Sequence, residues 1–168
     1  EIRERVVTVN GFGKSFAMTG WRIGYAHAPK PIAQRILKIH QQLNTNTAAF
    51  TQKAALAALK GTQEHRLAFI ERLRANKAVY AAFLKSCPAI KGSMPEGGFF
   101  AFIDISAAGL KSDAFCAALL GETGGAMLPG VSFGPEVDDC CRISLATPKE
   151  DFTKALALTA KFVEVRAR

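Results

Sequence analysis

The sequence predicts an α/β segment followed by an α+β segment, joined by one long helix. In the first segment, two strand-like stretches surround a glycine-rich turn, and two helical stretches follow them. Beyond Pro88 the pattern changes, and short strand-like stretches alternate with helical ones around turns that contain Gly and Pro. The 168 residues, 49% of them hydrophobic and 21% charged, suffice for one ordinary core or two small ones.

The first segment is expected to contain two strands and two helices. The strands are predicted over residues 6–9 and 21–27, and the helices over residues 31–43 and 48–59. The run Val-Val-Thr-Val at the first of these positions is typical of a buried strand. Pro31 suits the first turn of a helix, and Gly61 suits a helix C-cap.

A helix from residue 64 to about residue 85 is expected to connect the two segments. We place the domain boundary within it, so that residues 1–75 form the first domain and residues 76–168 the second. In the second domain we expect strands over residues 90–94, 99–105 and 142–146, and helices over residues 112–120 and 149–165.

The net charge of +8 is concentrated in the first half of the chain. Residues 1–86 carry 14 Lys and Arg against 4 Asp and Glu, whereas residues 87–168 carry 8 against 10. These cations are scattered along the expected helices without an aromatic-basic motif, which favours solvated helix surface over a nucleic-acid site. An anionic ligand or an acidic segment that faces the basic half is the alternative.

The composition argues against membrane-spanning and metal-binding classes. No uninterrupted apolar run approaches the ~20 residues that cross a bilayer, so we expect a cytoplasmic protein. The four cysteines have no CxxC spacing and the three histidines no zinc-ligand spacing, which predicts reduced thiols and no metal. Because the chain lacks an initiating Met, we expect it to begin within a larger protein.

Residues 10–25 carry the most informative motif, in which Lys14 precedes Arg22 by eight positions. Glycines flank both cations and allow the backbone to turn tightly and to approach a ligand closely. The motif therefore indicates a lysine that reacts and an arginine that holds an anion. Taken singly, each residue is more often a solvated surface group.

Four blocks of sequence resemble the C-terminal portion of a class I/II aminotransferase, a pyridoxal-phosphate enzyme of fold type I. The first is the run of residues 10–25, and the others are 95–100 (Pro-Glu-Gly-Gly-Phe-Phe), 129–134 (Pro-Gly-Val-Ser-Phe-Gly) and 142–147 (Arg-Ile-Ser-Leu-Ala-Thr). They occur in the order of the family. The resemblance implies that the first segment is the end of the large α/β domain and the second the small α+β domain.

The resemblance also implies a role for three residues. Lys14 would form the internal aldimine with pyridoxal 5'-phosphate and carry the proton between substrate and cofactor. Arg22 would hold the cofactor phosphate, and Arg142 the α-carboxylate of the substrate, because a planar guanidinium offers paired donors to two oxygens. The substrates would be an amino acid and a 2-oxo acid, and the full-length protein would be a homodimer.

Departures from the family limit this interpretation. Relatives often carry a serine one or three residues before the lysine, where this chain has Gly13 and Gly11, so that anchoring of the phosphate would depend more on Arg22. The carboxylate for the ring nitrogen precedes the lysine segment in relatives, so we expect this chain alone to be inactive. Two alternatives stay open: another fold type I enzyme, such as a lyase or decarboxylase, and a non-catalytic domain of a transcription regulator.

Overall fold

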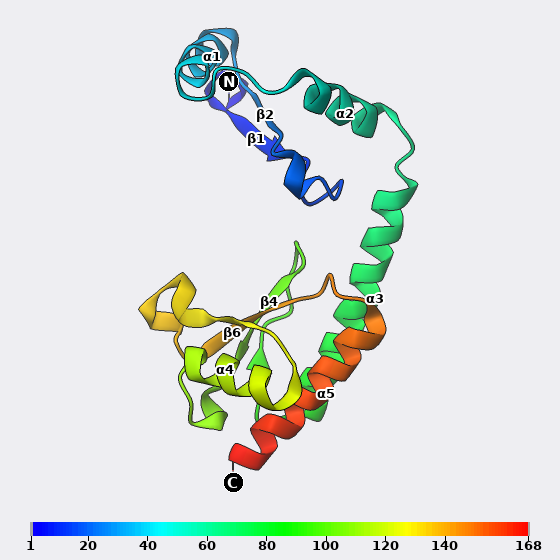
Figure 1. The fold of residues 1–168 in the computed structure, drawn as a ribbon, viewed down its shortest axis with the longest axis vertical. Helices are drawn as coiled ribbons and strands as arrows, with labels where there is room; N and C mark the ends of the chain where they lie inside the picture. Colours follow the sequence, from blue (N-terminus) through cyan, green and yellow to red (C-terminus); the bar gives the residue numbers. More distant parts are fainter. Residues whose placement is uncertain (1, 168) are drawn as a thin grey trace. The chain divides into compact units, whose positions relative to one another are not determined.

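The computed structural model describes residues 2–167 (Figure 1). Contacts within the chain divide it into two compact units between Ala68 and Phe69, a point that lies inside helix α3 (Glu64–Ser86). The same helix contains residue 75, the position of the predicted domain boundary. None of the described helices is both long and apolar enough to cross a membrane.

The first unit contains a β-hairpin and two helices. Its elements are η1 (Ile2–Arg5), β1 (Thr8–Gly11), η2 (Thr19–Trp21), β2 (Gly24–His27), α1 (Lys30–Asn44) and α2 (Ala49–Lys60). The two strands pair antiparallel, with Thr8 opposite His27 and Gly11 opposite Gly24. Both helices occur where the apolar spacing predicted them, and the backbone N–H of Gly61 caps α2 by donating to the carbonyl oxygen of Ala57 at 2.8 Å.

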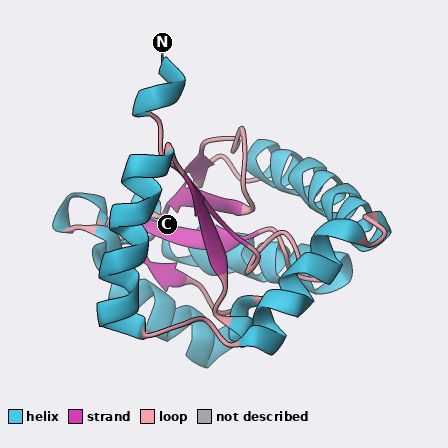
Figure 2. Cartoon of the chain, turned by 90° about the horizontal axis from the view of Figure 1, so that it is seen from above, coloured by secondary structure: helices cyan, strands magenta, loops and turns pink. Residues whose placement is uncertain are grey.

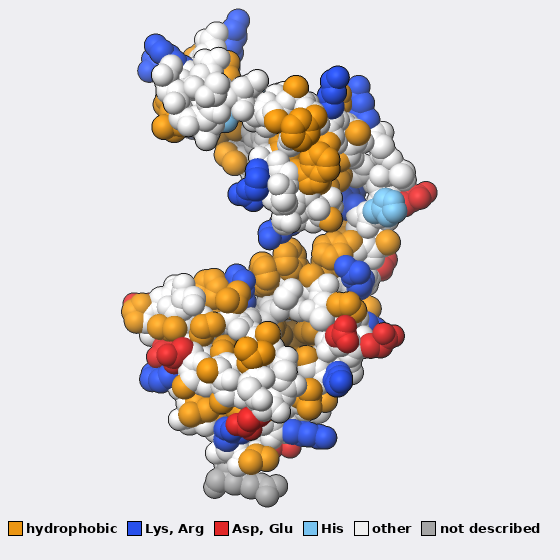
Figure 3. Space-filling model, viewed as in Figure 1, with side chains coloured by type: hydrophobic (Ala, Val, Ile, Leu, Met, Phe, Trp, Pro, Cys, Tyr) orange, Lys and Arg blue, Asp and Glu red, His pale blue; other side chains and the backbone are white. Residues whose placement is uncertain are grey.

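The prediction of a buried first strand is wrong. The strand begins two residues later than expected, and all four residues of β1 and of β2 are exposed, with Val9 at 76%. The apolar stripe of α1 is also uncovered, and none of its residues is buried. Figure 3 shows hydrophobic side chains at the surface of this unit. A Val-rich run identifies a strand, but burial also requires a neighbouring element, and no described element covers these strands.

The second unit packs three helices against a four-stranded antiparallel sheet (Figure 2). The strands, in sheet order, are β3 (Lys91–Gly92), β4 (Phe100–Asp104), β6 (Cys140–Ser144) and β5 (Leu128–Pro129). The helices are the C-terminal part of α3, α4 (Ser112–Thr123) and α5 (Lys149–Arg166), and the short turns are η3 (Ser106–Ala108), η4 (Gly130–Phe133) and η5 (Pro135–Val137).

Alternation along β4 and β6 decides which side chains form the core of this unit. Ala101, Ile103, Cys141 and Ile143 are buried, whereas the residues between them are half-buried on the opposite face. Successive side chains of a strand point to opposite faces, so one face of the sheet packs on the helices. The helices contribute apolar side chains to this core, among them Tyr80, Phe83, Phe115, Leu119, Phe152 and Phe162.

Strand ends differ most from the sequence prediction. β3 contains two residues instead of five, because only Lys91 and Gly92 pair with β4. β6 begins at Cys140 rather than Arg142, since its pairing with β4 extends from Cys140 to Ser144. β5 and the short 3-10 turns were not predicted, because two paired residues leave no periodicity in the sequence.

Candidate functional site

The β-hairpin of the first unit brings Lys14 and Arg22 into one connecting loop. The register pairs Gly11 with Gly24, so that residues 12–23 form the connection and contain both cations (Figure 1). A Cβ atom at Gly24 would lie 2.8 Å from the carbonyl oxygen of Asn10, which only a glycine avoids. Gly24 therefore allows the two strands to approach closely at the point where the loop begins and ends.

A small apolar cluster fixes this loop on the unit. Phe12 and Met18 are exposed by only 4% and 8%, and they pack with Ala55 of α2. The backbone N–H of Phe12 donates to the carbonyl oxygen of Ile23 at 3.3 Å, and that of Phe16 donates to Phe12 at 3.2 Å. The loop is thus tied to the hairpin at its base and to α2 at its middle.

The loop borders an open hollow of about 510 Å³. Its lining residues include the cationic Lys14 and Arg22, the hydroxyl residues Ser15 and Thr19, and Asn10. No acidic residue occurs among the described residues that line it. The remaining lining residues are Gly11, Gly13, Gly24, Met18 and Ile23. This set of donors is suited to an anionic ligand.

Arg22 occupies an uncommon backbone conformation. Its φ of 50° and ψ of 49° lie in the left-handed region, and its guanidinium Nη1 donates to the carbonyl oxygen of Thr19 at 3.1 Å. Ala17, in the same loop, has a φ of 53°. Non-glycine residues in this region cost about 1 kcal/mol or more each, and such positions cluster at functional sites. An arginine at a position that suits glycine makes Arg22 a candidate functional residue.

Ser15 and Thr19 were not singled out in the sequence. The glycines at positions 11 and 13 exclude a hydroxyl at those two positions, whereas these two hydroxyl residues line the hollow from positions that follow Lys14. Their presence within the same glycine-flanked run was the available signal. That these two residues line the hollow was not predictable from spacing alone, because the loop is irregular between residues 12 and 18.

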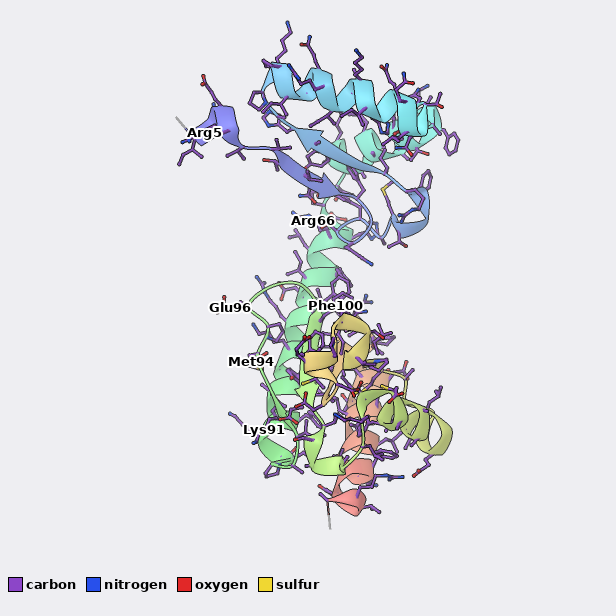
Figure 4. The ribbon with its side chains drawn as sticks, turned by 90° about the vertical axis from the view of Figure 1, so that its left-hand side faces the viewer. Arg5, Arg66, Lys91, Met94, Glu96 and Phe100 are labelled. Atoms are coloured by element: carbon purple, nitrogen blue, oxygen red, sulfur yellow. The ribbon has the colours of Figure 1, made fainter. Side chains whose placement is uncertain are left out.

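Arg142 belongs to the second unit, where it lies on the half-buried face of β6 between the buried Cys141 and Ile143. Its guanidinium carbon Cζ lies 4.0 Å from the ring centre of Phe100 and 4.9 Å from that of Phe133. Figure 4 labels Phe100 at the start of β4. Within the part of the chain that the structure describes, no carboxylate forms an ion pair with Arg142.

Comparison with known proteins identifies the family. The sequence profile "Aminotransferase class I and II" matches residues 1–157. The chain belongs to this family. The chain is 34% identical over 167 residues to an aspartate aminotransferase of Pyrococcus horikoshii, which covers 96% of the chain and 42% of that relative. It is 36% identical over 169 residues to an aspartate/prephenate aminotransferase of Cereibacter sphaeroides, with coverages of 95% and 42%.

Solved structures of aminotransferases share the fold. The chain superposes on an aromatic aminotransferase of P. horikoshii with a TM-score of 0.86 and 33% identity, over 97% of this chain and 44% of that one. For an aspartate aminotransferase of Thermotoga maritima the TM-score is 0.84 at 31% identity, over 96% and 40%. The chain therefore has the fold of the C-terminal portion of a fold type I aminotransferase, and it spans about two fifths of these relatives.

Proposed function

We propose that this chain carries part of the active site of a pyridoxal-phosphate-dependent aminotransferase. In the complete protein it would transfer an amino group between an amino acid and a 2-oxo acid. The observation that carries this proposal is the placement of Lys14 and Arg22 on one hollow at the closed end of the β1–β2 hairpin. Membership of the aminotransferase family supports the same reaction class.

The residues around the hollow fit one end of the cofactor. The guanidinium of Arg22 would bind the phosphate through paired donors, with the hydroxyls of Ser15 and Thr19 as further donors. Lys14 lines the same hollow, and its amine would hold the cofactor aldehyde covalently. When bound, the cofactor supplies an electron sink for the bond that breaks at the substrate Cα.

The protein residues would divide the remaining work. Arg142 would bind the α-carboxylate of the substrate, since its planar edge can donate two parallel hydrogen bonds to two oxygens. Once the substrate amine has displaced it from the cofactor aldehyde, Nζ of Lys14 would take the proton from Cα of the amino acid and pass it to the cofactor, and would carry it back in the reverse reaction. No acidic residue among the described lining can serve the ring nitrogen of the cofactor, so we propose that the carboxylate comes from outside this chain.

We propose that the complete protein acts as a homodimer. The chain alone would have little or no turnover, because the electron sink weakens without a carboxylate at the ring nitrogen. Reconstitution of the 168-residue chain with cofactor and an amino donor tests the low turnover expected of the chain alone. Turnover comparable to that of the complete protein would refute it.

Covalent trapping tests the role of Lys14 directly. The complete protein is incubated with pyridoxal 5'-phosphate, reduced with borohydride and digested, and the modified peptide is identified by mass spectrometry. We expect the modification on Lys14 and its loss in Lys14→Ala. Lys30→Ala, which removes an exposed lysine at the start of α1, serves as the matched control and should keep the modification. Full modification of Lys14→Ala at another lysine would contradict the proposal.

A further inference from the structure

Three stretches that are distant in sequence meet at the guanidinium of Arg142. β4 supplies Phe100, η4 supplies Phe133, and the Cζ atom of Arg142 lies 4.0 Å and 4.9 Å from the centres of their rings. These residues come from three of the blocks that the sequence analysis identified, two of which had no role assigned. We infer that Phe100 and Phe133 are positioning residues that hold the guanidinium of Arg142 ready for a carboxylate. The inference rests on the proposed role of Arg142.

The chemistry of the contact supports this role. A guanidinium is attracted to the face of an aromatic ring, and this contact uses the cation without consuming its N–H groups. An acidic partner would instead occupy those donors and compete with the substrate. Among the described residues Arg142 forms no ion pair, so the two rings compensate its charge and leave its donors for a ligand.

The turn that presents the ring of Phe133 is itself fixed. A Cβ atom at Gly130 would lie 1.9 Å from the carbonyl oxygen of Val137, so only glycine allows the close approach of these two segments. The backbone N–H of Val131 donates to the hydroxyl of Ser112 at 3.1 Å, and that hydroxyl donates to Oδ1 of Asp138 at 2.7 Å. Ser112 is fully buried.

The strand register adds a third ring. Phe102 lies directly opposite Arg142 in the β4–β6 pair. Its ring meets that of Phe133 edge to face, with centroids 5.3 Å apart and an interplanar angle of 81°. Aromatic pairs prefer this arrangement, so Phe102 restricts the orientation of Phe133. A side chain held in this way loses less conformational freedom when it binds a ligand, which raises affinity.

The experiment measures carboxylate affinity separately from turnover. In the complete protein, the dissociation constants of propanoate and of propanamide are determined by NMR titration. KM and kcat are measured for the amino acid and for the 2-oxo acid. The variants are Phe133→Leu, Phe133→Tyr and Arg142→Gln. Leu120→Ala, which truncates an exposed leucine of α4, is the matched control. Phe133 is 48% exposed, so its replacement is expected to leave the fold intact.

We expect Phe133→Leu to weaken propanoate binding about 3- to 30-fold, which is the range that the loss of a cation–π contact provides. The same variant should raise KM more than it lowers kcat. Phe133→Tyr, which keeps the ring, should bind propanoate as the unmodified protein does. The dissociation constant of propanamide, which carries no carboxylate, should be the same in every variant. Equal binding of propanoate by the leucine variant, or equal losses in the leucine and tyrosine variants, would overturn the inference alone. Unchanged propanoate binding in Arg142→Gln would overturn the proposed function of Arg142 as well.

Discussion

The side-chain nitrogen of Asn76 donates to the carbonyl oxygen of Leu145 at 2.8 Å, across 69 residues of sequence. The same nitrogen donates to the carbonyl oxygen of Thr147, also at 2.8 Å. Asn76 is fully buried, and among the described residues its Oδ1 has no hydrogen-bond partner. One amide on α3 therefore satisfies two carbonyl oxygens just after β6, the strand that carries Arg142.

Asn76→Ala should lower the free energy of unfolding by about 2 kcal/mol or more, because it leaves buried carbonyl oxygens without donors. Asn76→Asp should be at least as destabilising, since a carboxylate cannot donate to them. Urea unfolding followed by circular dichroism measures the loss. Asn44→Ala is the control, because Asn44 is exposed and its amide contacts only His40 among the described residues. A control loss as large as that of Asn76→Ala would contradict the explanation.

Arg22→Ala should weaken binding of pyridoxal 5'-phosphate about 10- to 100-fold, the range expected for hydrogen bonds to a charged group. Arg22→Lys should recover only part of this loss, because an ammonium cannot donate two parallel hydrogen bonds to one phosphate. Cofactor affinity in the complete protein is measured by fluorescence titration. Arg35→Ala, which changes an exposed arginine of α1, should bind the cofactor normally, and equal losses in both alanine variants would refute a specific role for Arg22.

Replacement of glycine by alanine should have opposite effects on stability at Gly130 and at Gly121. Gly130→Ala should destabilise the protein by about 2 kcal/mol or more, because the new Cβ would meet the carbonyl oxygen of Val137 at 1.9 Å. Gly121→Ala should stabilise it by about 0.5–1 kcal/mol, because Gly121 lies inside α4 with open space around it. Thermal unfolding compares the two variants. Similar melting temperatures would contradict the packing described for η4.

The stability conferred by Asp138 should depend on pH. The hydroxyl of Ser112 donates to Asp138, and with Lys111 nearby the pKa of this carboxyl lies below its ordinary value. A carboxyl whose pKa is lower in the folded state stabilises fully above its unfolded pKa of ~3.9, and the effect is lost as pH falls through the folded pKa.

Asp138→Asn should therefore lower the urea midpoint at pH 7 and have a smaller effect near pH 2.5. Glu96→Gln, in the exposed loop labelled in Figure 4, should change the midpoint little at either pH. An effect of Asp138→Asn that is as large at pH 2.5 as at pH 7 would show that the carboxylate charge is not the cause.

Cys140 should react slowly with iodoacetamide although its side chain is only half-buried. Burial and the neighbouring Asp139 raise the pKa of this thiol to about 11, and the thiolate is the reactive form. Labelling at pH 7.5 should be far slower than for free cysteine and should accelerate after unfolding in urea. Fast labelling of Cys140 in the folded protein, located by peptide mass spectrometry, would contradict the raised pKa.

Local sequence signals predicted the long elements and placed the glycine-flanked lysine in a connection between two strands. The pattern of α1 and the long run of α3 required only helical spacing. The ends of β6 were not predictable, since pairing with β4 decides them. The exposure of Val9 was also missed, because burial depends on which neighbouring element covers the strand.

The neighbours of the site residues were harder to predict from the sequence than the site residues themselves. Arg142 was identified by its block, but nothing in that block indicates that Phe133 meets it, because the irregular turn of η4 determines where that ring lies. Asn76 likewise looks like an ordinary polar residue in a helix. Only the tertiary structure shows that its amide reaches the segment after β6.

The alternation of β6 makes the chain sensitive to length at one place and tolerant at another. Because Arg142 stands between two core residues, the insertion of one residue into β6 before Cys141 would turn the guanidinium toward the core and bring Cys141 to the aromatic face. Gly97 and Gly98, in contrast, lie in an exposed loop before the paired residues of β4, so a change of length there would not by itself shift the register of β4 with β6. A substitution in β6, unlike an insertion, would leave its alternation unchanged.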